Sequence, residues 1–236
     1  GEQVIPTYDG FQNIICMTKS SSYGDLGPYC LKNENGHIIE NVYQFSKLYN
    51  KVNYSLQRYS RYDSTIIWRY PESTFIENNL ILPNYWQWRN KGMESRYPIR
   101  YPVNYNDRSN CIGAIKTFDS YDEPKNLNDF EILDYVESRK QIYIPMYINS
   151  VKKERKYRLL QSKLNQGINL LICEIDCSYQ DSLEYYKETY GVEDDFIKDW
   201  TMEANEENIK LMLNDTKHPF GHAYCLAMAL LDISID

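Results

Sequence analysis

The chain lacks most of the short motifs by which a familiar chemistry is identified. It contains no Gly-rich phosphate loop of the Walker or Rossmann type, which argues against the nucleotide-binding folds built on such a loop. Its three histidines and six cysteines show no spacing typical of a metal site, and no Ser-His-Asp arrangement can be argued from three histidines in these contexts. We therefore expect no metal and no cofactor.

Long apolar runs are also missing. No run approaches the length that crosses a membrane, and no signal peptide is visible, so a cytoplasmic, intracellular protein without membrane contact is expected. The cysteines form no CxxC pair, and several lie in apolar runs such as that ending at Cys173. Reduced, buried thiols are the interpretation that this usage favours.

The chain also lacks an excess of positive charge. The formal net charge is −7, which argues against broad phosphate-driven binding to nucleic acid but leaves room for a local basic pocket. Arg89, Arg96 and Arg100 belong to one local cluster of cations. They are either a phosphate clamp or surface salt-bridge partners. A second cluster, residues 152–158, is typical of a solvated helix face.

What the chain does contain is enough apolar sequence, 42 %, for a core, and its 236 residues fit one domain. Buried strands are expected at 13–17 and 169–176, and a hairpin at 33–36, where Asn-Gly separates two apolar runs. We expect helices at 84–92, at 149–165 and at 221–233. A further helix, capped at 128–129, should be interrupted by Pro145. Two acidic helices should follow residue 178, separated at Gly191.

A polar stripe begins where the hairpin ends. Glu40, Gln44 and Lys47 are spaced by four and then three residues, which places them on one face of a predicted helix. Such a stripe is either a solvated face with an ordinary Glu-to-Lys pair or the wall of a polar pocket. The sequence alone leaves both interpretations open.

Two stretches together resemble the start of the NADAR family, namely Tyr23-Gly24-Asp25-Leu26 and Glu40-x-x-x-Gln44-x-x-Lys47. Asn41 stands where the family has His, and Leu26 where it has Phe. Residues 170–176 and 220–228 resemble the family's C-terminal strand and final helix in the same order. Residues 177–219 between them are then interpreted as an insertion into a single domain, 1–236.

The resemblance implies an α+β fold that is mostly helical with a small β-sheet. It also implies an N-glycosidase that cleaves the bond between a base-like nitrogen and ribose. Its substrate would be an ADP-ribosyl conjugate, ADP-ribosylated guanine or a ribosyl-phosphate of the riboflavin pathway. Such a reaction needs one carboxylate for the cationic ribose and a second acid for the leaving base. Glu40 suits the first role, and Asp176, with Asp215 as its rival, the second.

Further residues are candidates for binding the nucleotide-like substrate. Gln44 would hold a hydroxyl or base edge, and Lys47 a phosphate. The turn at Tyr23, Gly24 and Asp25 could stack on a base or approach a phosphate, or be a plain strand-ending turn. The remaining candidates each have a structural alternative, as a core aromatic, a surface ion pair or a structural histidine; they are Trp86, Arg89, Arg100, Gly221 and His222.

Two other functions compete with catalysis. The chain could be a binding module for ADP-ribose or a nucleotide that has the pocket without the activity. It could also be a protein-interaction domain that presents the acidic 177–219 segment to a partner. The sequence does not choose among the substrates or settle the oligomeric state.

Overall fold

The computed structural model describes residues 5–17, 22–60, 63–99 and 109–235. Arg100, predicted to clamp a phosphate, therefore lies outside the described residues. The chain divides into two compact units, residues 1–27 with 147–236 and residues 28–146, and each is described by itself below. The boundary falls within helix α5 (Ile144–Val151). Within the described ranges, no helix is both long and apolar enough to span a membrane.

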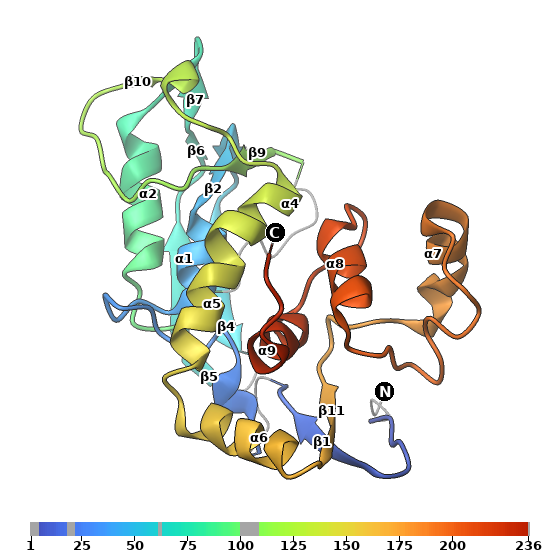
Figure 1. Cartoon of the computed structure of the whole chain (residues 1–236). Helices are drawn as coiled ribbons and strands as arrows, with labels where there is room; N and C mark the ends of the chain where they lie inside the picture. The colour runs from blue at the N-terminus through green and yellow to red at the C-terminus, as the bar shows by residue number, and fades with distance from the viewer. Residues whose placement is uncertain (1–4, 18–21, 61–62, 100–108, 236) are drawn as a thin grey trace. The chain divides into compact units, whose positions relative to one another are not determined.

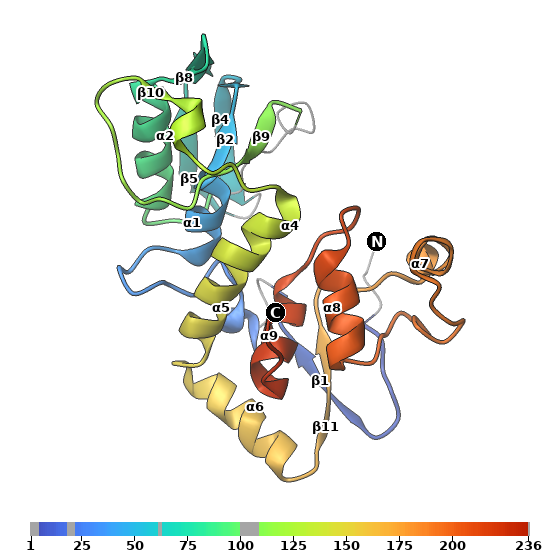
Figure 2. The same ribbon diagram turned by 45° about the horizontal axis from the view of Figure 1, so that its top comes forward.

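The second unit, residues 28–146, packs two helices against a set of small antiparallel sheets (Figure 1; Figure 2). Helix α1 (Ile39–Phe45) contacts α2 (Pro83–Met93), and a turn at 33–36 precedes α1 as predicted. The strand pairs are β2 (Lys47–Tyr49) with β9 (Cys111–Ala114), β3 (Lys51–Val52) with β6 (Ser73–Thr74), and β4 (Ser55–Ser60) with β5 (Asp63–Tyr70). A three-stranded sheet has the order β10 (Lys125–Asn126), β8 (Leu80–Ile81), β7 (Ile76–Glu77).

Aromatic side chains fill the core of this unit. Trp86 and Trp88 of α2 are both 0 % exposed, and Phe45 of α1 packs 4.7 Å from the Trp88 ring. Trp86 was a candidate for contact with a substrate, but both tryptophans are core residues. Trp86 packs against the rings of Tyr121 and Phe130, and Trp88 also packs against Phe75.

The helix expected after residue 127 begins later than predicted. A single 3-10 turn at Leu127–Asp129 is followed by extended residues, of which Leu133 pairs with Ala114. Helix α4 (Tyr135–Ser138) then starts with Asp134 as its cap. Pro145 does not interrupt the helix. A π-helical segment, Arg139–Tyr143, precedes α5, and the wider turn accommodates the missing N–H of Pro145.

The first unit is built on one parallel strand pair, β1 (Phe11–Ile15) with β11 (Asn169–Cys173). Helices α6 (Arg155–Asn165) and α9 (His222–Leu231) contact β11, and α8 (Glu206–Asn214) contacts α9 (Figure 1). Helix α7 (Leu183–Tyr190) ends at Gly191, whose φ of 70° is the left-handed geometry expected of a helix stop. The predicted helix at 149–165 is divided, because residues 152–154 separate α5 from α6.

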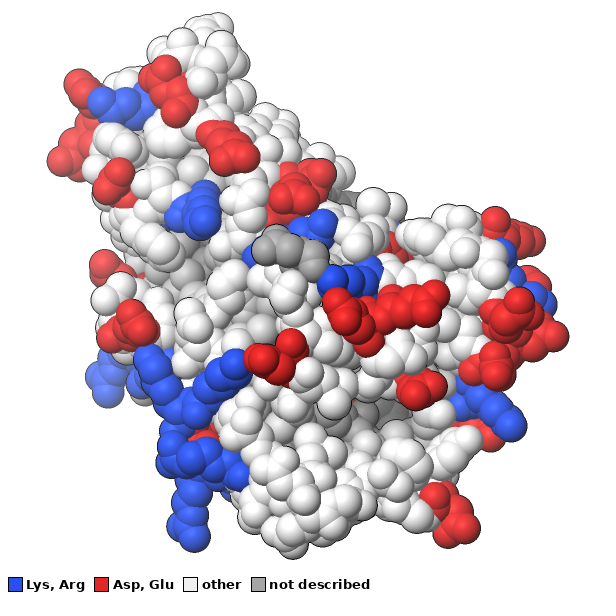
Figure 3. All heavy atoms as spheres, viewed as in Figure 1, with Lys and Arg blue, Asp and Glu red and all other residues white. Residues whose placement is uncertain are grey.

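The expected α+β class, with more helix than strand and small sheets, is confirmed. All six cysteines are thiols rather than disulfides, and Cys16, Cys173 and Cys225 are buried. Residues 152–158 lie mainly on the surface, where Figure 3 shows lysine and arginine gathered at the lower left.

Candidate functional site

The predicted polar stripe is a hydrogen-bonded chain in the second unit. Gln44 Nε2 donates to Glu40 Oε1 at 2.8 Å, and Lys47 Nζ donates to Gln44 Oε1 at 2.7 Å. Glu40 is only 8 % exposed, and Gln44 and Lys47 are half-buried. Since α1 ends at Phe45, Lys47 belongs to β2 rather than to the helix, yet its ammonium still completes the chain. This burial argues against an ordinary solvated Glu-to-Lys face.

Neighbouring residues hold this chain in place. The Lys47 ammonium lies 4.9 Å from the centre of the Tyr43 ring, and Tyr43 is itself hydrogen-bonded to Ser138 at 3.2 Å. Burial raises the pKa of the Tyr43 hydroxyl well above its usual range, so the phenol stays neutral. The Gln44 amide that contacts Glu40 is thus held by the Lys47 ammonium, which lies against the Tyr43 ring.

Asn41, the residue beside Glu40, fixes the loop that follows α2. Its Nδ2 donates to the Tyr97 carbonyl at 2.9 Å, and its Oδ1 accepts from the Ile99 N–H at 2.7 Å. Because Asn41 is fully buried, these bonds tie α1 firmly to residues 95–99. Asn41 therefore has a structural role, at the position where the NADAR family, which the sequence resembles, has His.

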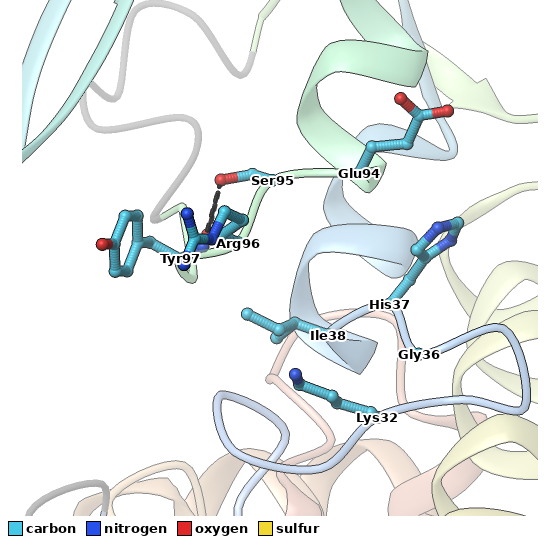
Figure 4. Close-up of a pocket in the computed structure, with 8 residues that line it drawn as sticks. All are labelled: Lys32, Gly36, His37, Ile38, Glu94, Ser95, Arg96 and Tyr97. Carbon is cyan, nitrogen blue, oxygen red and sulfur yellow. Dashed lines mark hydrogen bonds between the residues drawn. The ribbon is translucent and has the colours of Figure 1, made fainter.

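The loop held by Asn41 forms one wall of a pocket of about 280 Å³ (Figure 4). Arg96 and Tyr97 come from that loop, while Lys32 and His37 come from the hairpin before α1. Ile38, which precedes the first residue of α1, also lines the pocket. The lining holds two cations, Lys32 and Arg96, against one carboxylate, Glu94, and this balance favours an anionic group.

Arg89, a predicted phosphate clamp, lies elsewhere. Its side chain is 1 % exposed and donates to the main-chain carbonyls of Ile115 and Thr117. In this position the guanidinium joins α2 to the chain after β9 and is not available to a ligand. The sequence offered no means of separating this buried arginine from the exposed Arg96.

The remaining predicted residues belong to the first unit. The Tyr23–Asp25 turn is fixed by Lys156 of α6, whose Nζ lies 2.9 Å from the Asp25 carboxylate and 2.6 Å from the Ser22 carbonyl. The Tyr147 hydroxyl donates to the Leu26 carbonyl at 2.7 Å. These contacts give the turn a structural role, and they leave the Tyr23 ring half-exposed.

Gly221 and His222 begin α9, next to a carboxylate that the sequence analysis did not select. Glu174 directly follows β11; its side chain is 7 % exposed, and its Oε1 lies 3.7 Å from His222 Nδ1. A side chain at position 221 would overlap Glu174 Oε2, so glycine is required there. His222 Nε2 lies 2.9 Å from the Cys16 carbonyl. Gly221 and His222 thus serve the packing of β1, β11 and α9.

Asp176, predicted as the second acid, is exposed, two residues beyond Glu174. It belongs to the first unit and Glu40 to the second. Burial raises the pKa of Glu174, an effect that the neighbouring His222 opposes. Glu174 could have been noticed as the first carboxylate after the apolar run, but its burial depends on a helix about fifty residues further on.

Asp215, the rival second acid, cannot donate a proton near neutral pH. Burial alone would raise its pKa, but hydrogen bonds from His218, the Lys217 N–H, Tyr185 and Tyr186 outweigh burial and lower it to about 2. Asp215 is 1 % exposed, and its carboxylate is charged near neutral pH. We therefore regard it as a structural anion.

A serine, a histidine and an aspartate that no signal in the sequence connects lie in one hydrogen-bonded group. Ser182 Oγ lies 3.3 Å from His218 Nε2, and His218 Nδ1 lies 2.7 Å from Asp215 Oδ2. Sequence spacing could not reveal this group, because α7 and α8 separate the serine from the other two residues. Among the described residues, no group of three or more His, Cys, Asp or Glu side chains is placed to hold a metal.

Comparisons with protein-family models, with curated proteins and with solved structures found no match to this chain.

Proposed function

We propose that the chain is an N-glycosidase that hydrolyses the bond between a base-like nitrogen and ribose in an ADP-ribosyl or ribosyl-phosphate substrate. The observation that carries the proposal is the hydrogen-bonded chain of buried Glu40 with half-buried Gln44 and Lys47. A buried carboxylate flanked by fixed polar groups is suited to a transition state in which the ribose ring becomes cationic. The resemblance to the NADAR family points to the same residues.

Within this proposal Glu40 stabilises the positive charge that develops on the ribose, or activates the attacking water. Gln44 orients the carboxylate through its amide, and the Lys47 ammonium orients the amide in turn. The leaving base must also be protonated, and Asp215, which its hydrogen bonds hold as an anion, is not suited to that role.

The pocket beside α1 supports a phosphate-bearing substrate. Lys32 and Arg96 supply the cations that an acidic protein needs to bind a phosphate or diphosphate. Ile38, in the wall of the pocket, is two residues from Glu40 in the chain.

The test is a hydrolysis screen with ADP-ribose, ADP-ribosylated guanine and a ribosyl-aminopyrimidine phosphate. Release of the free base or of the ribose phosphate is followed by chromatography, and binding is measured in parallel by calorimetry. We expect release from at least one of the three. Binding without release would favour the nucleotide-binding module instead. If the chain neither binds nor hydrolyses any of the three compounds, both the enzyme and the nucleotide-binding module are refuted. The acidic 177–219 segment would then be tested for partner binding by deleting residues 178–214.

A further inference from the structure

Ser182, His218 and Asp215 form a hydrogen-bonded relay within the first unit. Ser182 closes the 3-10 turn Gln180–Ser182 directly before α7, and Asp215 follows the last residue of α8. The two distances along the relay are 3.3 Å from Ser182 Oγ to His218 Nε2 and 2.7 Å from His218 Nδ1 to Asp215 Oδ2. A serine, a histidine and a buried aspartate in this order are the parts of a nucleophilic triad.

Asp215 is positioned to orient the histidine. Its Oδ1 accepts hydrogen bonds from Tyr185 at 2.8 Å and from Tyr190 at 3.1 Å, and its Oδ2 accepts from Tyr186 at 3.1 Å. Main-chain N–H groups of Lys217 and His218 donate to the same carboxylate. An acceptor held so firmly cannot turn away from the imidazole.

The aspartate also determines which nitrogen of His218 carries the proton. A carboxylate 2.7 Å from Nδ1 can only accept, so we assign the proton of the neutral imidazole to Nδ1. The lone pair of Nε2 then faces the hydroxyl of Ser182. The rings of Tyr185 and Tyr186, centred 5.0 and 5.2 Å from the imidazole, fix its plane. This is the tautomer that a general base requires.

The Ser182 side chain does not cap α7, although serine at this position usually caps the helix. It precedes the first residue of α7 but makes no capping hydrogen bond, and its φ and ψ of −91° and −6° are helical rather than extended. Its hydroxyl is directed to His218 instead. Ser182 is half-buried, and the His218 side chain is 22 % exposed, so both remain within reach of a solute.

An exposed aromatic surface adjoins the serine. Tyr179 is 39 % and Trp200 50 % exposed, and their rings are 6.2 Å apart. Tyr179 accepts the hydrogen bond of the Ser182 N–H, which places it in the same turn. Trp200 and Asp199 both have positive φ, 63° and 52°, in a tight turn closed by Lys198 and Thr201. Non-glycine residues held in this costly geometry are often found at functional sites.

The charge of this segment restricts what it could bind. Asp181 and Glu184 flank Ser182 on the surface, and Figure 3 shows acidic side chains gathered at the right, over the position of α7. An anionic substrate would be repelled there, whereas the aromatic pair suits an uncharged apolar or aromatic group.

We propose that Ser182 is the nucleophile of a second, esterase activity that hydrolyses uncharged carboxylic esters with an apolar or aromatic group. Ser182 Oγ attacks the carbonyl carbon while its proton passes to His218 Nε2, and the carbonyl π pair moves onto oxygen at the N-terminal end of α7. Collapse of this intermediate breaks the ester C–O bond, and the alcohol leaves with the proton from His218. Water then releases the acid from Ser182 by the same steps in reverse order.

The experiment uses the full chain, an alkyl fluorophosphonate probe and phenyl butyrate as the ester. We expect one adduct per chain, on the peptide that contains Ser182, and turnover of the ester. Ser182→Ala should remove both. His218→Gln should slow both at least about 100-fold, as loss of the base does in such triads. Ser162→Ala, at an exposed serine of α6 in the same unit, should change neither.

Circular dichroism melting curves show that each variant compared is folded. Three results would overturn the proposal: no adduct on Ser182 in the unaltered chain, equal labelling of His218→Gln, or labelling without turnover of the ester. The last two would show a reactive serine without the relay or without the esterase activity.

Discussion

Two carboxylates that are two residues apart in the chain lie in opposite environments. Asp176 is exposed, whereas Glu174 is buried at the start of α9 beside His222. Burial raises the pKa of Glu174 because the charged form loses its hydration. Between the unfolded and folded pKa values of Glu174, the folded state binds more protons than the unfolded state. The contribution of Glu174 to stability is therefore fully present below the unfolded pKa and is lost as the pH rises through the folded pKa.

Glu174→Gln keeps the shape of the side chain and removes this ionisation. We expect the free energy of unfolding of the unaltered chain to fall, relative to that of the variant, as the pH rises from about 4.5. Urea unfolding at a series of pH values from 4.5 to 8.5 measures the difference. Glu188→Gln, at an exposed position of α7, is the matched control and should show no such trend. Parallel pH curves for the chain and for Glu174→Gln would contradict the assignment.

At the scale of residues, the sequence indicated which side chains lie together better than it indicated which are buried. The spacing of Glu40, Gln44 and Lys47 was sufficient to place them together. The sequence could not show that Arg89 is bonded to the carbonyls of Ile115 and Thr117 while Arg96 lines a pocket. That difference depends on contacts with residues distant in the chain. The relay of Ser182 was missed for the same reason.

At the scale of elements, the contact between α1 and α2 depends on a glycine. A Cβ at Gly92 would overlap the ring of Phe45. In an open helix, Gly→Ala stabilises by about 0.5–1 kcal/mol. At this position overpacking, which costs about 1–3 kcal/mol, works against that gain.

Gly92→Ala is therefore expected to destabilise the chain by about 1–2 kcal/mol, the opposite sign to an open helix site. Denaturant unfolding monitored by tryptophan fluorescence measures it, because Trp88 packs against the same phenylalanine. Gln87→Ala, exposed on the same helix, should have little effect. A stabilised Gly92→Ala variant would mean that the two helices do not approach closely.

The sequence predicted elements best where their signals were local. The turn at 33–36, helix α2, strand β11 and the helix stop at Gly191 were all found near their predicted positions. The region from residue 127 to 151 was predicted less well. There the pairing of Leu133 with Ala114 delays the helix, and the π-helical segment accommodates Pro145. The first effect comes from a long-range pairing that no local signal in the sequence indicates.

At the scale of the whole molecule, Asp215 joins α7 to the end of α8 and to Lys217 and His218, which precede α9. Its folded pKa of about 2, against an ordinary value of 3.8, means that its contribution to stability is present above the unfolded pKa. That contribution is lost as the pH falls from about 4 to about 2, and it is worth roughly 2 kcal/mol.

Asp215→Asn should lower the free energy of unfolding at pH 7 by about 2 kcal/mol and flatten its decline between pH 4 and pH 2. Urea unfolding of both chains at pH 7, 4 and 3 tests this. Asp195→Asn, at an exposed position in the same unit, provides the comparison. An unchanged slope in acid would show that Asp215 is not the anion that holds this region together.

The predicted class of the whole chain was right, but its division into two units was not foreseen. Residues 1–27 join a unit otherwise made of residues 147–236 because β1 pairs with β11, a contact that no local signal carries. As a result, the candidate residues at Tyr23 and at Glu40, adjacent parts of one sequence motif, are described in different units.

The most direct test of the proposed N-glycosidase is Glu40→Gln, assayed on whichever ribosyl substrate the unaltered chain hydrolyses. The amide keeps the hydrogen-bonding shape but cannot stabilise a cationic ribose, so kcat should fall at least about 100-fold while the substrate is still bound. Glu72→Gln, exposed in the same unit, should keep full activity. Unchanged hydrolysis by Glu40→Gln would contradict the role given to the hydrogen-bonded chain of Glu40, Gln44 and Lys47.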